Sequence, residues 1–303
     1  MSRAGSATRM SRRPRSPAGD QQAIKSPFRQ AFTRLRRNRA AMIALFVLVA
    51  EMVIAAGAPL FTQYDPVAIE PPDSLQAPSA KHIMGTDQFG RDIYARVLFG
   101  ARISLQVGVV SVGIATICGV PLGLVAGYYG GRVDSSIVRA MDLMLAFPGI
   151  LLALAIVTIL GPSLRNSMIA VGISAIPSRV RLVRGSVLFT KENAYVEAAR
   201  ALGCSESTIM FRHILPNIVS PLIVLSSLGI ATAILTAASL SFLGLGAQPP
   251  TPEWGAMLGG GRAYMGVAWW MTTFPGVAIM VTVLAMNILG DGLRDAFDPK
   301  LGE

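Results

Sequence analysis

The 303-residue chain is 52% hydrophobic and only 15% charged, with a mean hydropathy of +0.53. Soluble proteins carry about 25% charged residues, so this chain has too few to cover a water-facing surface, and its composition indicates an integral membrane protein. The two cysteines and two histidines are too few for a zinc cluster and imply no disulfide framework. The formal net charge of the chain is +10.

The basic charge is concentrated at the N-terminus, where eleven of the 27 Lys and Arg residues precede Ala40 and only Asp20 opposes them. A basic segment before an apolar run is a topology signal. Nucleic-acid binding is the alternative, and it is disfavoured because the segment has few aromatic residues to stack on bases. We therefore expect residues 1–27 to form a basic, disordered cytoplasmic tail, and we expect no nucleic-acid partner.

The apolar runs of the chain predict six membrane-spanning helices, since a helix needs about 20 residues to cross the hydrocarbon. Their apolar residues are continuous rather than alternating, which favours helices over barrel strands. Pro177 interrupts the fourth run and arginines follow at once, so we expect that helix to leave the hydrocarbon near Pro177. The predicted spans are residues 40–60, 103–127, 137–160, 166–183, 218–243 and 271–289.

Lys and Arg residues predict the orientation of these spans, because they concentrate in cytoplasmic segments. With the N-terminus inside, 21 basic residues fall on the cytoplasmic side and six fall outside. The predicted fold is an all-α integral membrane protein with six transmembrane helices and both termini in the cytoplasm. We divide it into a tail (1–27), a first helix with an extracytoplasmic loop (28–100), a five-helix core with a cytoplasmic loop at about 184–217 (101–292), and a C-terminal cytoplasmic tail (293–303).

A four-residue glycine repeat in the second predicted span removes side chains from one helix face. Its members are Gly119, Gly123 and Gly127. Small residues at this spacing let another helix approach closely, so the repeat predicts a helix-packing surface rather than a chemical site.

The chain has no sequence motif for ATP hydrolysis. A phosphate-binding loop ends in Gly-Lys-Ser or Gly-Lys-Thr, and none of the four lysines follows a glycine. A carrier driven by an ion gradient would place ionisable residues in its spans, and only Glu51 is a candidate. For Glu51 we favour a packing role over a substrate or subunit contact. The spans also contain no set of catalytic or metal-ligating residues, so we expect no enzyme.

The cytoplasmic loop contains the most informative stretch, Tyr195-Val196-Glu197-Ala198-Ala199-Arg200-Ala201-Leu202-Gly203. Its composition predicts a short helix, which Gly203 would end in a left-handed conformation. Ser205 would then cap a second helix that runs toward Leu215 and ends at Pro216.

The first of these helices has residues suited to a partner's groove. Ala198 and Ala199 would give it a small-residue surface, and Glu197 could pair with a basic residue of the partner. A solvated cytoplasmic loop explains the same residues equally well on physical grounds alone.

This loop resembles the EAA motif of permease subunits from ATP-binding-cassette importers, through Glu197-Ala198-Ala199, Gly203 and Leu215-Pro216. Residues 212–217 read Arg-His-Ile-Leu-Pro-Asn, which is similar to the peptide branch of that family. Further matching strings cover about residues 28–300. They include Gly85-Thr86-Asp87, Gly90-Arg91-Asp92, Phe147-Pro148-Gly149, Pro252-Glu253-Trp254-Gly255 and Gly290-Asp291-Gly292.

The resemblance implies a type I ABC importer transmembrane domain in a prokaryotic plasma membrane. This chain would be the second permease subunit of a dipeptide or glutathione importer, with oligopeptide and nickel import as alternatives and an ion-driven carrier less favoured. Its implied partners are a homologous permease, two cytoplasmic ATP-binding subunits, an extracytoplasmic binding protein and membrane lipid. ATP would bind the partner subunits, so the chain itself would hold no cofactor. The implied contacts with the ATPase are Tyr195, Glu197, Ala198, Ala199, Gly203, Leu215 and Pro216.

Overall fold

The computed structural model describes residues 27–297, which form helices joined by loops, with one isolated β-bridge between Thr86 and Asp92. The expected N-terminal tail lies outside the described residues, except for Pro27. The helices are α1 (Pro27–Arg37), α2 (Arg39–Ala56), α3 (Ala58–Phe61), α4 (Ile93–Tyr129), α5 (Gly131–Leu145), α6 (Gly149–Leu160), α7 (Leu164–Ser174), α8 (Ile176–Thr190), α9 (Ala194–Ala201), α10 (Glu206–Thr208), α11 (Val219–Phe242), α12 (Trp254–Gly261) and α13 (Trp270–Phe297).

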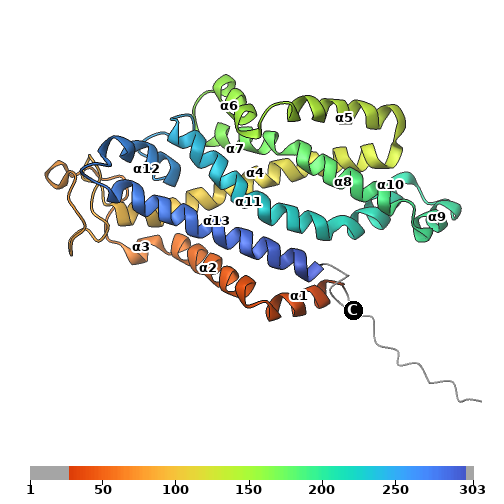
Figure 1. The fold of residues 1–303 in the computed structure, drawn as a ribbon, viewed down its shortest axis with the longest axis horizontal. Helices are drawn as coiled ribbons and strands as arrows, with labels where there is room; N and C mark the ends of the chain where they lie inside the picture. Colours follow the sequence, from red (N-terminus) through yellow and green to blue (C-terminus); the bar gives the residue numbers. More distant parts are fainter. Residues whose placement is uncertain (1–26, 298–303) are drawn as a thin grey trace, which may run out of the picture.

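The long helices run along one axis of an elongated bundle (Figure 1). The loop at residues 62–92 and α12 gather at one end. Helices α1 and α9 and the C-terminal end of α13 lie at the other end. We call this second end cytoplasmic, because the basic residues concentrate in its segments. Helix α13 continues to Phe297, so the first residues of the expected C-terminal tail are helical.

Four helices of the described chain are long and apolar enough to cross a bilayer. They are residues Arg39–Ala56, Ile93–Tyr129, Glu206–Phe242 and Trp270–Phe297. Helices α5 and α6 would form a fifth span only as a pair that is bent by 89°. The prediction of one continuous helix over 137–160 is therefore wrong. The break falls at Phe147-Pro148, because a residue before proline is disfavoured in the helical conformation and proline donates no backbone hydrogen bond.

The fourth predicted span is also divided, into α7 and α8, with the break at Ala175. Pro177 lies in the first turn of α8, where a proline fits because its missing N–H has no helical acceptor there. The helix is therefore interrupted just before Pro177, and the expectation that it leaves the hydrocarbon near this residue stays a prediction. Helix α8 begins there and continues to Thr190, packed along α4.

The glycine repeat of α4 forms this contact, as predicted. A Cβ atom placed on Gly119, Gly123 or Gly127 would lie 2.6–2.7 Å from a Cβ atom of α8. Real Cβ atoms do not approach this closely, so any side chain here would separate the helices. The residues of α8 that fill the three positions are Arg179, Val183 and Val187.

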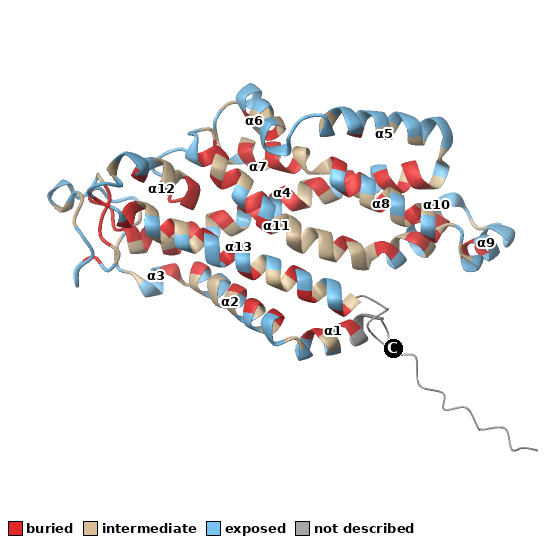
Figure 2. Ribbon diagram, viewed as in Figure 1, coloured by how far each residue is buried: buried red, intermediate tan, exposed pale blue. Residues whose placement is uncertain are grey.

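Buried residues lie where the long helices face one another, whereas α5 is largely exposed (Figure 2). Large apolar side chains of α5 and α6 are also exposed, including Leu143, Leu151 and Ile159. Two ion pairs join the ends of α5 to α8: Arg181 Nη2 lies 2.6 Å from Asp142 Oδ1, and Arg184 pairs with Asp134.

The side chain of Glu51, a residue of α2, contacts α13. Thr282 Oγ1 donates a hydrogen bond to Glu51 Oε1 at 2.6 Å. This bond places the Glu51 side chain in the contact between two helices, and its packing role stays a prediction.

The α4–α8 contact predicts a sharp difference between two glycines of the same helix. Gly123→Val should force the helices apart and lower the free energy of unfolding by about 1–3 kcal/mol. Gly113→Val is the matched control, because no atom lies within 4 Å of a Cβ at that position. Thermal unfolding of the two purified variants in detergent measures the difference. Equal midpoints would contradict the packing role of the repeat.

Candidate functional sites at the two ends of the bundle

The cytoplasmic loop has an apolar core of its own. Val196 is fully buried and Ala199 is almost so. They pack in one cluster with the segment that leads into α11 and with α4 and α8, through Ile209, Ile214, Ile218, Leu124, Val183 and Val187. Lys191 Nζ adds a hydrogen bond to the carbonyl oxygen of Gly127 at 2.9 Å. Helix α9 is therefore fixed to the bundle rather than free in solution.

The turn after α9 has the predicted geometry. Gly203 has φ +77°, a left-handed conformation that glycine adopts without steric cost. Its N–H donates to Arg200 O at 3.0 Å, and the Cys204 N–H donates to Ala199 O at 3.1 Å. These two bonds are the Schellman pattern of a helix C-terminus. Ser205 Oγ then accepts from the Thr208 N–H at 3.4 Å and caps the next helix, as expected.

Pro216 does not end this second helix, and that expectation is wrong. The chain continues through a π-helical segment (Ile209–Ile214) and a 3₁₀ turn (Leu215–Ile218) into α11. Pro216 has no N–H to donate, and the hydrogen-bond spacing changes around it. The chain therefore stays helical up to the membrane span.

The seven residues expected at the ATPase contact divide into an exposed and an inward group. Ala199 and Leu215 pack against the apolar core of the loop, so Ala199 is not part of a small-residue surface as expected. The exposed members are Tyr195, Glu197, Ala198, Gly203 and Pro216. Leu202, 84% exposed, lies at the end of the same helix and was not singled out from the sequence. The outer face of α9 thus has a small side chain, Ala198, in its middle and larger side chains, Tyr195 and Leu202, at its ends.

The opposite end of the bundle is organised by buried charges. His82 is 2% exposed, with Nδ1 at 2.9 Å from Asp92 Oδ2 and Nε2 at 3.3 Å from Asp73 Oδ2. Asp92 Oδ1 also accepts from the Ala95 N–H and caps α4. Lys81 Nζ lies 2.6 Å from Asp73 Oδ2. These bonds order a long loop whose regular structure is limited to a 3₁₀ turn (Pro71–Asp73) and the β-bridge between Thr86 and Asp92.

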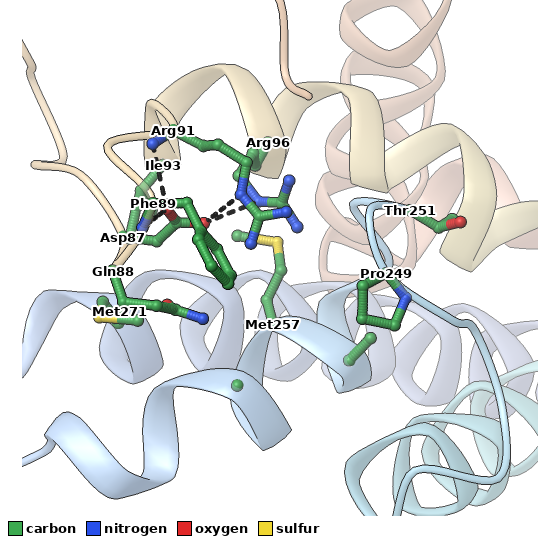
Figure 3. A pocket seen from close by; sticks show the side chains of 12 residues that line it. Asp87, Gln88, Phe89, Arg91, Ile93, Arg96, Pro249, Thr251, Met257 and Met271 are labelled. Carbon is green, nitrogen blue, oxygen red and sulfur yellow. Dashed lines mark hydrogen bonds and ion pairs between the residues drawn. The ribbon is translucent and has the colours of Figure 1, made fainter. Parts of the chain in front are cut away.

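A second charged cluster joins this loop to the segment before α12 (Figure 3). Arg91 Nε donates to Asp87 Oδ2 at 2.6 Å. Arg96 Nη1 donates to the carbonyl oxygens of Pro66 and Pro250, at 2.7 and 3.3 Å. The cavity beside the cluster has a volume of about 80 Å³. Ligand pockets usually measure about 300–1,000 Å³, so this one is too small for a peptide.

Two tryptophans fix the same surface to the helices. Trp254 Nε1 donates to Val97 O, and Trp270 Nε1 donates to Thr86 O, both at 3.0 Å. Glu253 accepts from the Gly255 and Ala256 N–H groups and caps α12, while burial raises the pKa of its carboxyl group. Strings that are far apart in the sequence, near residues 85–92 and 249–255, thereby lie side by side in one largely buried junction at the outer end.

The charge network at this end predicts an acid-sensitive loop. The hydrogen bond from Lys81, with a contribution from His82, holds the pKa of Asp73 below its ordinary value. The ion pair thus stabilises the loop above an ordinary aspartate pKa of about 3.9, and this contribution is lost as the pH falls through the lowered pKa. Lys81→Ala should move acid opening of the loop to higher pH.

Hydrogen–deuterium exchange of residues 73–92 against pH measures this opening. Lys191→Ala is the control, because Lys191 bonds a backbone carbonyl at the cytoplasmic end. An unchanged pH midpoint in Lys81→Ala would contradict the assigned role of the ion pair.

Comparison with known proteins identifies the class. Residues 119–303 match the family described as binding-protein-dependent transport system inner membrane component. Residues 26–78 match the N-terminal transmembrane domain of oligopeptide transport permease C. The chain therefore belongs to the inner-membrane permease subunits of ABC importers.

Individual relatives are similar over almost their whole length. The chain is 51% identical to a dipeptide transport system permease protein of Alkalihalophilus pseudofirmus, over 94% of each chain. It is 50% identical to a glutathione transport system permease protein of Pectobacterium atrosepticum, over 92% of this chain and 93% of the relative. It is 44% identical to a di/tripeptide transport system permease protein of Pseudomonas aeruginosa, over 94% and 96%.

The fold also matches a solved transporter. The inward-facing MetNI methionine ABC transporter aligns with a TM-score of 0.54 at 20% identity, over 66% of this chain and 96% of the other. The predicted fold class, a type I ABC importer transmembrane domain, is confirmed, and the chain is a multi-pass protein of the bacterial inner membrane.

Proposed function

We propose that this permease subunit imports short peptides of the dipeptide or glutathione type. The observation that carries the proposal is the 44–51% identity, over more than nine-tenths of the chain, to permeases named for dipeptides, di/tripeptides and glutathione. The chain would form half of the membrane pore beside a homologous permease subunit. Two cytoplasmic subunits would bind and hydrolyse ATP, and an extracytoplasmic binding protein would deliver the peptide.

The geometry of α9 supports a role in ATPase coupling. A short helix that is held by a buried core and exposes Ala198 between larger residues fits a groove of a partner closely. Because α9 follows α8 after three residues, movement of the ATPase would pass directly to a helix of the bundle. The outer end of the bundle, around residues 85–92 and 249–255, would receive the binding protein.

Purification tests the complex and its substrate together. The tagged chain, extracted gently from native membranes, should copurify with a second permease and with ATP-binding subunits. The binding protein captured with them should contain a dipeptide, a short peptide or glutathione. A binding protein loaded with nickel or a longer oligopeptide would overturn the substrate class. If the chain purifies alone and transports without ATP, its assignment as a subunit of an ATP-driven importer would be overturned.

Ala198→Arg tests the coupling surface. The residue is exposed, so the substitution leaves the loop folded but places a long cation where the ATPase would approach. Peptide uptake and peptide-stimulated ATP hydrolysis by the reconstituted transporter should fall about tenfold or more. Ser207→Arg, on the exposed surface of α10, is the matched control and should retain activity. Normal uptake by Ala198→Arg would contradict the coupling assignment.

A further inference from the structure

A cavity of about 440 Å³ lies among α4, α6, α7, α8 and α11. Its lining includes Ser111 of α4 and Leu228 and Thr232 of α11, which stand near the middle of these long helices. The cavity therefore lies near the middle of the bundle, at the depth of the membrane. Its volume is within the range of small-ligand pockets, unlike that of the cavity beside Asp87 and Arg91.

One charged side chain, Arg179 from the first turn of α8, lines this cavity. Arg179 is only 4% exposed, and neither its Nε nor its Nη2 has a hydrogen-bond partner within residues 27–297. None of the described residues that line the cavity is acidic. A buried, unpaired guanidinium is costly at membrane depth, and such residues usually mark a substrate path. This burial cannot be read from the sequence, because Arg179 stands beside Arg181 and Arg184 and has the same pattern as a basic residue at the end of a span.

Two glycines make room for this side chain. A Cβ on Gly229 of α11 would collide with Nη2 of Arg179. A Cβ on Gly119 of α4 would lie 2.6 Å from Cβ of Arg179. Because these two positions have no side chain, the Arg179 side chain has room to extend between the helices to the cavity.

The hydroxyl groups of the lining complement the cation. Ser174 Oγ donates to Val171 O at 2.9 Å, and Thr236 Oγ1 donates to Thr232 O at 2.8 Å. Because their protons are used in these bonds, the hydroxyls offer acceptor lone pairs to a ligand. A wall with one fixed cation and several acceptors suits a molecule that has a carboxylate and an ammonium group.

We infer that Arg179 binds the carboxylate of the transported peptide in this cavity during its passage through the membrane. The inference rests on the proposed function and adds a contact within the membrane to it. Arginine binds carboxylates with two parallel hydrogen bonds, and Nε and Nη2 are the pair of donors that this geometry uses. A counter-ion from the second permease subunit is the competing explanation. It is disfavoured because helices of this chain already cover the side chain.

The test uses the complete transporter in proteoliposomes, with dialanine and its C-terminal amide as probes. Each probe is supplied at a concentration that saturates the binding protein. The wild type should import dialanine about tenfold faster than the amide, because the amide lacks the charged partner of Arg179. Arg179→Gln should lose this preference: its import rate for dialanine should fall about tenfold, and its import rate for the amide should stay unchanged. Arg179→Lys should retain part of the preference.

Three further measurements make the result decisive. Arg181→Gln is the matched control, because Arg181 lies on the same helix, is exposed and pairs with Asp142; it should keep the wild-type preference. Gly229→Ala keeps the arginine but displaces its guanidinium, and it should reduce the preference in the same direction. Equilibrium binding of labelled dialanine to the complex without binding protein should weaken about tenfold in Arg179→Gln.

Other outcomes would overturn the inference. A wild type without preference, or an Arg179→Gln variant that slows both probes equally, would exclude carboxylate binding. Loss of the second permease from purified Arg179→Gln complexes would assign the arginine to subunit contact. If the wild type imports neither dialanine, nor its amide, nor glutathione, the proposed substrate class itself fails, and the two failures are thereby distinguished.

Discussion

The direct contact between α4 and α8 positions both the membrane cavity and the cytoplasmic loop. Three glycines at four-residue spacing let Cβ atoms of α8 reach the backbone of α4. The contact fixes the whole length of α8, from Arg179 in its first turn to Val187 near its end. Without it, neither the arginine nor the helix that follows α8 would have a defined place.

Helix α8 consequently connects the two proposed sites, the cavity and the cytoplasmic loop. Its first turn supplies the cation of the cavity, and its last turn leads into α9, whose inner face packs on Val183 and Val187. A rigid helix of this kind transmits displacement because packed cores have discrete arrangements rather than continuous ones. Movement of α9 on an ATPase would thus reach the cavity through a single element of secondary structure.

The two ends of the bundle are held by different forces. Apolar side chains of the α9 loop, such as Val196 and Ile214, form a small core next to the membrane. The outer loop packs Leu75 and Met84 on an apolar cluster that contains Trp254 and Trp270, and it is fixed in addition by buried charges, such as the contact between His82 and Asp92. The composition of each segment explains the difference. The outer loop is rich in proline and aspartate, which favour turns and charge-assisted hydrogen bonds over helix packing.

The sequence by itself determined the membrane location and most helix positions, because long apolar runs and basic flanks act locally. The class of protein followed from the resemblance of its cytoplasmic loop and other motifs to a known family. The sequence also determined the turn at Gly203 and the packing face of α4, since both depend on glycine at fixed spacing. Only the tertiary structure decided that Ala199 faces inward, that the chain remains helical past Pro216, and that the third span is sharply bent. It alone separated Arg179 from the neighbouring arginines, because the burial of a charge depends on which helices surround it.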